Sequence, residues 1–302
     1  MTCLPFSKLR LGPAVRKPQS WPAGGGAEAL SGTPGYRRPY NGDMPGYDLS
    51  EPECRLAVID YAPCARMPVH DHPTLGFAIV LRGTVEETVG RTTQQAGAAG
   101  LVIKPPGTLH SNRFGPSGAR LLSLEFRRER AEELVSADAL RRWRWLHDPA
   151  VLRLAAGALR PVSVLAPAAE RGDALLSGLL ELLAGETQRG DGRRPPIWLC
   201  AVRDRLHAEY MGPCRVRELA REAGVHPVHL ARVFRQHFGA SVTQYLRDVR
   251  LRAAASGLGE PTAGIAEVAA AAGFADQSHL CRAFRAAVGV PPSNYRALVR
   301  AG

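Results

Sequence analysis

The residues best suited to chemistry lie along a short basic segment near the C-terminus. Residues 277–288 read QSHLCRAFRAAV, in which Leu280, Ala283, Phe284 and Ala287 repeat at the spacing of a buried helical stripe. The opposite face is left with Gln277, Ser278, Cys281, Arg282 and Arg285. Amide, hydroxyl and guanidinium groups gathered on one helix face can hydrogen-bond to base edges and phosphates. The pattern therefore predicts a helix that reads double-stranded DNA.

The elements around this helix are those that a DNA-reading helix needs. Ala269 is small where two helices must cross closely, and Gly273 falls where the chain must turn with positive φ. Asp276 is a good N-cap for the helix that follows. A short helix, a glycine turn and a second, basic helix form a helix-turn-helix, whose second helix enters the major groove.

The same pattern occurs a second time, fifty positions earlier. HLARVFRQHFG at His229–Gly239 aligns with HLCRAFRAAVG at His279–Gly289, with six of eleven positions identical. The outward residues of this first copy are Val228, Ala231, Arg232, Arg235 and Gln236. Two such units predict two recognition helices in successive major grooves, about 34 Å apart.

The repeat also suggests a role for individual side chains. Arg232 and Arg282 occupy equivalent positions, and we expect each to contact a guanine edge. Arg235 and Arg285 are expected to hold phosphates. His229 and His279 also repeat, and packing or a phosphate contact explains them better than base reading.

With GFADQSHLCRAFRAAVGVPPSNYR as its C-terminal signature, the doubled unit at residues 197–300 resembles the DNA-binding domain of the AraC/XylS-type transcription regulators. The resemblance covers about a third of the chain. It implies a sequence-specific, cytoplasmic, non-enzymatic regulator that acts as a homodimer with a small-molecule effector, with RNA polymerase as a further candidate partner. It leaves open whether DNA binding activates or represses transcription.

Composition agrees with a polyanionic partner. The net charge is +11 and the pI is about 9.9. Residues 197–302 hold 14 arginines against 8 acidic residues. The six cysteines form no C-x-x-C pair and do not indicate a disulfide framework. No apolar run is long enough to span a membrane.

Residues 46–130 have a different texture, with short β-prone runs between turn residues. The predicted strands are CRLAVIDY, FAIVL, VEETV, GLVIK and RLLSLEF. Many short strands in so few residues indicate a small barrel or jelly roll. His70 and His72 stand two positions apart, so on a strand both would face the same side.

The segments Val69–Gly83 and Gly100–His110 together resemble the two motifs of the cupin barrel. In that fold, His-x-His with a later Glu binds a metal, and a histidine after Pro-x-Gly completes the set. His70, His72 and His110 match, but Gly76 and Phe77 stand where the Glu would fall. Three readings stay open: ligands of a divalent metal, hydrogen-bonding groups of an effector pocket, or polar side chains of a relic barrel. A metal-dependent cupin enzyme with a DNA-binding module is the alternative function, which the missing Glu disfavours.

The sequence thus predicts an α+β two-domain chain. Its N-terminal cupin-like β-barrel, a jelly roll with trailing helices, precedes an all-α domain of two helix-turn-helix units. The segments are a disordered basic arm (1–45), the effector-binding barrel (46–130), a helical region (131–184), a linker (185–196) and the DNA-binding domain (197–302). The helical region is expected either to form dimer contacts, as the resemblance implies, or to cover the barrel.

Overall fold

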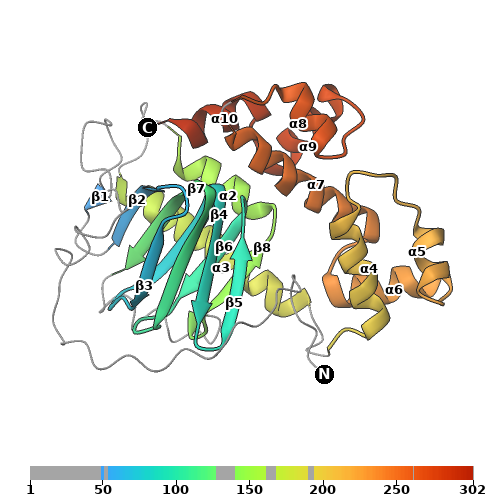
Figure 1. The fold of residues 1–302 in the computed structure, drawn as a ribbon, viewed down its shortest axis with the longest axis horizontal. Helices are drawn as coiled ribbons and strands as arrows, with labels where there is room; N and C mark the ends of the chain where they lie inside the picture. The colour runs from blue at the N-terminus through green and yellow to red at the C-terminus, as the bar shows by residue number, and fades with distance from the viewer. Residues whose placement is uncertain are drawn as a thin grey trace.

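The computed structural model describes residues 49–50, 54–126, 140–160, 168–189, 194–260 and 262–301. The arm predicted for residues 1–45 lies outside the described residues, as do the last residues of the predicted barrel (127–130) and the first of the predicted helical region (131–139). An antiparallel sheet makes up the N-terminal half, and helices make up the C-terminal half (Figure 1).

The strands belong to one sheet that folds back on itself. They are β1 (Leu49–Ser50), β2 (Cys54–Tyr61), β3 (Arg66–His70), β4 (Leu75–Val89), β5 (Thr92–Ala96), β6 (Gly100–Lys104), β7 (His110–Phe126) and β8 (Arg144–His147). The first half of β4 pairs with β6 and its second half with β5. Likewise, β7 pairs first with β3 and then with β2. The two long strands therefore run through both halves of the sheet, as in a jelly roll.

Both long strands bend at a pair of glycines. Gly83 in β4 and Gly118 in β7 each have a φ of +72°, which side chains rarely tolerate. A Cβ on Gly83 would overlap the carbonyl oxygen of Gly118. This bend explains why FAIVL and VEETV, which we predicted as separate strands, form one strand.

The two faces of the sheet bury different clusters. An inner cluster draws on both halves of the sheet, so it lies between them; it consists of Ala65, Ala78, Val80, Val85, Ala96, Val102, Phe114, Ala119, Leu121 and Trp145. The outer face packs against α2 (Ala150–Ala158) and α3 (Ala168–Arg189). The predicted stripes of these helices are buried there, including Leu152, Ala155, Leu179 and Leu183.

Two details of the region between the domains differ from the prediction. Residues 144–147 are the strand β8 rather than helix, pairing with β6. Trp145 lies in the inner cluster and Leu146 in the outer one, which is the alternation of a strand. In addition, α3 continues to Arg189, so the first five residues of the predicted linker are helical.

The C-terminal half contains the two predicted helix-turn-helix units. Its helices are α4 (Ile197–Ala208), α5 (Val216–Glu222), α6 (Pro227–Phe238), α7 (Val242–Gly259), α8 (Ile265–Ala271), α9 (Gln277–Val288) and α10 (Pro292–Arg300). We call α5–α6 the first unit and α8–α9 the second unit; α7 connects them. No described helix is both long and apolar enough to cross a membrane.

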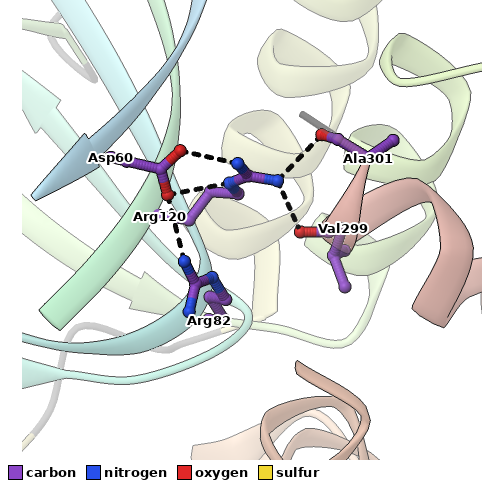
Figure 2. A network of polar contacts seen from close by, with 5 residues as sticks. All are labelled: Asp60, Arg82, Arg120, Val299 and Ala301. Atoms are coloured by element: carbon purple, nitrogen blue, oxygen red, sulfur yellow. Dashed lines mark hydrogen bonds and ion pairs between the residues drawn. The ribbon is translucent and has the colours of Figure 1, made fainter. Parts of the chain in front are cut away.

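Helix α10, which follows the second unit, is joined to the sheet by a polar network (Figure 2). Arg120 of β7 donates two hydrogen bonds to the carboxylate of Asp60, at 2.9 and 2.6 Å. Its remaining amino group donates to the carbonyl oxygens of Val299 and Ala301 at the end of α10, at 3.2 and 2.8 Å. Arg82 donates to the same carboxylate at 3.2 Å.

The network favours the charged form of Asp60. Burial alone would raise the pKa of Asp60, but hydrogen bonds and charge from Arg120, with those of Arg82, hold it below its ordinary value. Nearby, a Cβ on Gly259 of α7 would lie 2.7 Å from Cβ of Arg82, so only glycine lets α7 approach β4 this closely.

Candidate nucleic-acid interface and barrel site

The first recognition helix, α6, is held by a buried stripe and by caps at both ends. Leu230, Val233 and Phe234 are buried in the first unit's core. His226 caps the helix by accepting from the backbone N–H of Val228, at 3.3 Å. Gly239 ends it with a φ of 69°.

The outward face of α6 carries the predicted DNA-contacting residues. All five are exposed: Val228, Ala231, Arg232, Arg235 and Gln236. Val228 is 70% exposed, which is unusual for a large apolar side chain and suits contact with a thymine methyl group. The Arg232 guanidinium lies 3.4 Å from Nδ1 of His229, so this histidine borders the predicted base contact.

The second recognition helix, α9, has the same construction. Asp276 accepts from the backbone N–H of His279 at 2.6 Å, confirming the predicted N-cap. Leu280, Phe284 and Val288 are buried, whereas Ala283 and Ala287 are only partly so. The predicted reading residues Gln277, Ser278, Arg282 and Arg285 are exposed, and Cys281 is half-buried.

The turns within the two units also match. Gly224 and Gly273 have φ values of 65° and 76°. Their backbone N–H groups donate to the equivalent carbonyls of Arg221 and Ala270. The two recognition helices thus have the same length and turn, and each ends at a positive-φ glycine. The predicted reading residues gather on one face of each helix; their contacts with DNA remain a prediction.

The three predicted barrel histidines do come together. One nitrogen from each of His70, His72 and His110 lies within 4.8 Å of the others. Nδ1 of His70 donates to the carbonyl of Pro68 at 2.7 Å, and Nδ1 of His110 donates to that of Thr108 at 2.8 Å. Each Nε2 then keeps its lone pair, which is the tautomer that a metal-ligating histidine adopts.

The site keeps its histidines neutral. Burial, followed by the charge of Lys104, lowers the pKa of His72 to about 4 and that of His110 to about 3. Burial also lowers the pKa of His70. Neutral imidazoles can accept a hydrogen bond or bind a metal ion, so the arrangement fits both of those uses.

Sequence reasoning missed two charged members of this site, Glu87 and Lys104. Glu87 is fully buried, and its Oε1 lies 3.7 Å from Nε2 of His110. Nζ of Lys104 lies 3.1 Å from that oxygen and 3.3 Å from the same imidazole. In VEETV, Glu87 lies two positions after Val85, which faces inward, so the two side chains share one face of the strand. The site therefore has a carboxylate, although not at Gly76 or Phe77.

Comparison with known proteins matches both halves of the chain. Residues 57–184 match the model of an AraC-like ligand binding domain, and residues 219–298 match that of a helix-turn-helix domain. The regulator GlxA of Rhizobium meliloti is 35% identical over 98 residues, which are 32% of this chain and 30% of that protein. The Msm operon regulatory protein of Streptococcus mutans is 28% identical over 122 residues, 40% of this chain and 44% of that protein.

The chain therefore spans less than half the length of these curated relatives. Among solved structures, the C-terminal domain of AraT, a response regulator from Geobacillus stearothermophilus, is 28% identical. It covers 34% of this chain and 87% of its own, with a TM-score of 0.33.

Proposed function

The chain belongs to the AraC-type transcription regulators, and we propose that it reads a bipartite DNA sequence under the control of a small molecule bound in its barrel. The observation that carries the proposal is the repeated geometry of α6 and α9, each with exposed arginines at equivalent positions. The 18 residues of α7 connect them. At 1.5 Å per residue this helix spans about 27 Å, the scale of one turn of DNA.

The proposed contacts follow from side-chain chemistry. Arg232 and Arg282 read guanine in the major groove, one in each half-site. Val228 and Ala231 contact thymine methyl groups, while Gln277 and Ser278 hydrogen-bond to base edges. Arg235 and Arg285 hold phosphates and set the register. Gln236 on α6 and Cys281 on α9 are the remaining residues that we propose to face the DNA.

The barrel acts as the effector domain in this proposal. His70, His72 and His110 line the effector site, and contacts between the domains connect it with both recognition helices. The trailing helix α2 packs against α9, and α3 contacts α6. Arg153 of α2 donates to the carbonyl oxygen of Ala287, at the end of α9, at 2.9 Å. An effector that moves the trailing helices would change how the two readers are spaced.

The remaining parts of the proposal concern organisation. We propose the division into domains given above, a cytoplasmic regulator without enzymatic activity, a homodimer, and RNA polymerase as a further partner. Burial of α2 and α3 against the sheet supports their covering role. Dimer contacts would have to use the exposed sides of these helices.

The test is selection from random DNA duplexes by the purified full-length protein, near physiological salt because low salt inflates non-specific binding. We expect a motif with two parts about 10 base pairs apart. A matched selection uses Arg120→Ala, which releases α10 from the sheet. Enrichment by the variant alone would mean that the domain junction restrains binding. No enrichment by either protein would refute sequence-specific reading.

A further inference from the structure

A cavity of about 800 Å³ lies where the effector domain meets both helix-turn-helix units. Asp148 and Arg153, at the start of α2, line it on the side of the effector domain, and the other lining residues come from the end of α6, from α7 and from α9. Its described lining includes neither the three barrel histidines nor the predicted reading residues. Small-molecule sites occupy about 300–1,000 Å³, so this cavity is large enough to be a binding site of its own.

Two residues of α7 that line the cavity, Asp248 and Arg252, carry opposite charges. They are four positions apart, a spacing at which a carboxylate and a guanidinium on a helix often form an ion pair. Instead of pairing, Nε of Arg252 donates to the backbone carbonyl of Asp248 at 3.4 Å, and the carboxylate accepts from Nε2 of Gln244 at 3.0 Å. An anion and a cation therefore stand next to each other at the cavity without forming a direct pair.

The other charged side chains that line the cavity have partners within the protein. Arg153 donates to the carbonyl oxygen of Ala287 at 2.9 Å, and Asp148 accepts from the backbone N–H of Ala150 at 2.8 Å. Arg247 donates to the side-chain amide of a neighbouring glutamine at 3.5 Å. The carboxylate and the guanidinium of α7 are therefore the charges best placed to receive a ligand.

Burial disfavours both of these charges. It raises the pKa of Asp248 to about 6, and the charge of Asp148 acts in the same direction. It also lowers the pKa of Arg252 below its ordinary value. A ligand that brings a cation to the carboxylate and an anion to the guanidinium would offset the cost of burying each charge.

The same cavity also has an apolar lining. It consists of Ala283, Ala286 and Ala287 of α9, together with Phe238 at the end of α6. The alanine methyl groups leave space that longer side chains would fill, and the phenylalanine ring offers a flat apolar contact. A ligand bound to the two charges of α7 can therefore bury an apolar group against the ends of both recognition helices.

We propose that this cavity binds an α-amino acid with an apolar side chain, whose carboxylate pairs with Arg252 and whose ammonium pairs with Asp248. Residues four apart on a helix have Cβ atoms about 5–6 Å apart, which suits a ligand with both charged groups on one carbon atom. The site goes beyond the proposed function, because it is separate from the barrel site and takes a second ligand. Only its effect on DNA rests on that function: the bound amino acid would hold α2 and the ends of α6 and α9 at a fixed spacing.

The test is calorimetric titration of the full-length protein with L-leucine and L-phenylalanine, and with the N-acetyl and amide derivatives of each. We expect one bound amino acid per chain. The N-acetyl derivative lacks the ammonium and the amide lacks the carboxylate, so each should bind at least about tenfold more weakly than its parent. These titrations need no substitution, so they test the proposal even where a variant does not fold.

Variants of the two α7 residues assign each charge of the ligand to its partner. Arg252→Gln should weaken binding of the amino acid by at least about tenfold and leave binding of the amide unchanged, because the amide has no carboxylate to lose. Asp248→Asn should likewise affect the parent but not the N-acetyl derivative. As matched controls, Arg250→Gln removes a cation of α7 outside the cavity, and Glu209→Gln removes an exposed carboxylate that follows α4. Neither control should change amino-acid binding.

Three outcomes would overturn the site: no binding of either amino acid, a derivative that binds as tightly as its parent, or equal effects of Arg252→Gln and Arg250→Gln. DNA binding is measured separately with and without the amino acid. Amino-acid binding that leaves DNA affinity unchanged would preserve the site and refute its role in regulation. DNA selection that fails while the amino acid binds as expected would refute the regulator proposal alone.

Discussion

The two helix-turn-helix units share one geometry but are stabilised differently. The first unit packs with α4 and the start of α7 in a core of its own, which includes Leu199, Leu219, Leu230 and Phe234. The second unit, with Phe274, Leu280 and Phe284, belongs to the core that also contains the outer face of the sheet, α2 and α3. In Figure 1 the first unit (orange) lies beside the sheet, and the second unit (red) lies above and to the right of it, with α10 ending over the sheet.

The difference gives the two copies of the repeat different connections to the effector domain. A cavity of about 800 Å³ lies between α2 and the helices of both units, lined by Arg153, Phe238, Arg252 and Ala286 among others. The second unit lines this space through α9, and the helix that follows it, α10, is fixed to the sheet by Arg120. We infer that the effector domain positions the second unit directly, and the first mainly through α7.

Replacing the equivalent phenylalanines of the two cores should have the largest effect on the free energy of unfolding. Phe284→Ala and Phe234→Ala each empty a fully buried site, at a cost of about 3–5 kcal/mol in unfolding free energy. Because Phe284 lies in the shared core, its loss should reduce hydrogen-exchange protection of the sheet and of the second unit together. Phe234→Ala should affect the first unit. Unchanged protection of the sheet in Phe284→Ala would disprove the shared core.

Removing Arg120, which connects the sheet with α10, should have the next largest effect on stability. Arg120→Ala leaves two helix-end carbonyls without their donor, and it leaves Asp60 with Arg82 as its remaining partner. Since Asp60 is 37% exposed, water screens part of the loss, and we expect about 1–3 kcal/mol.

Two arginines serve as controls for this variant. Arg250 makes the analogous bonds near the first unit, to the carbonyls of Tyr210 and Gly212 at 2.7 and 2.8 Å. Arg250→Ala should therefore loosen the end of α4 and leave α10 protected. Arg113→Ala on β7 breaks only an exposed pair with Glu86, at under about 1 kcal/mol. Equal effects of Arg113→Ala and Arg120→Ala on α10 would argue against the connection.

Variants that remove one proposed base contact from each recognition helix compare the two units in DNA binding. Arg232→Ala and Arg282→Ala should each cost about 1–3 kcal/mol on the selected site and relax specificity at one position, in opposite halves of the motif. Binding to systematically mutated duplexes measures both effects. A uniform loss on every sequence would instead make that arginine a phosphate contact.

Acidification should destabilise the barrel through His110 and the region of the first unit through His207. Burial lowers the pKa of His110 in the barrel to about 3, and that of His207 in α4 to about 4. Because the unfolded chain binds protons near pH 6.5, stability is complete above that pH and falls as pH decreases toward the folded values. At pH 6 the loss is under about 1 kcal/mol per histidine. Denaturant unfolding between pH 7.5 and 5 measures it, and a flat profile would contradict both shifts.

The repeat and its outward residues could be predicted because apolar spacing specifies which face of a helix is buried. It does not specify the partner of that face. Leu280 and Phe284 give the same stripe as Leu230 and Phe234, yet only the former share a core with the sheet. What distinguishes them lies far away in sequence, at Arg120 and Arg82, whose positions depend on strand register.

The barrel site shows the same limit. The predicted histidines do gather, because a two-residue spacing and the Pro-x-Gly turn are local features. Glu86 and Glu87 are adjacent acids on one strand, and alternation says only that they face opposite sides. Which of the two is buried depends on the bend of β4 at Gly83, which a sequence of short apolar runs does not show.

The smallest expected difference concerns the helix caps. Asp276 accepts a 2.6 Å bond at the start of α9, whereas His226 accepts one of 3.3 Å at the start of α6. Asp276→Ala should cost about 1 kcal/mol, because the carboxylate also interacts with the helix dipole. His226→Ala should cost roughly a few tenths of that, since Pro227 already fixes the first turn.

Hydrogen exchange at the first turns of α6 and α9 measures these costs. If the sheet restrains the second unit, fraying in Asp276→Ala should stay within the first turn of α9, and Arg282 should keep its effect on DNA specificity. The double variant with Arg120→Ala removes that restraint, and its cost should then exceed the sum of the two single costs. Simple additivity would mean that the sheet and the cap act on α9 independently.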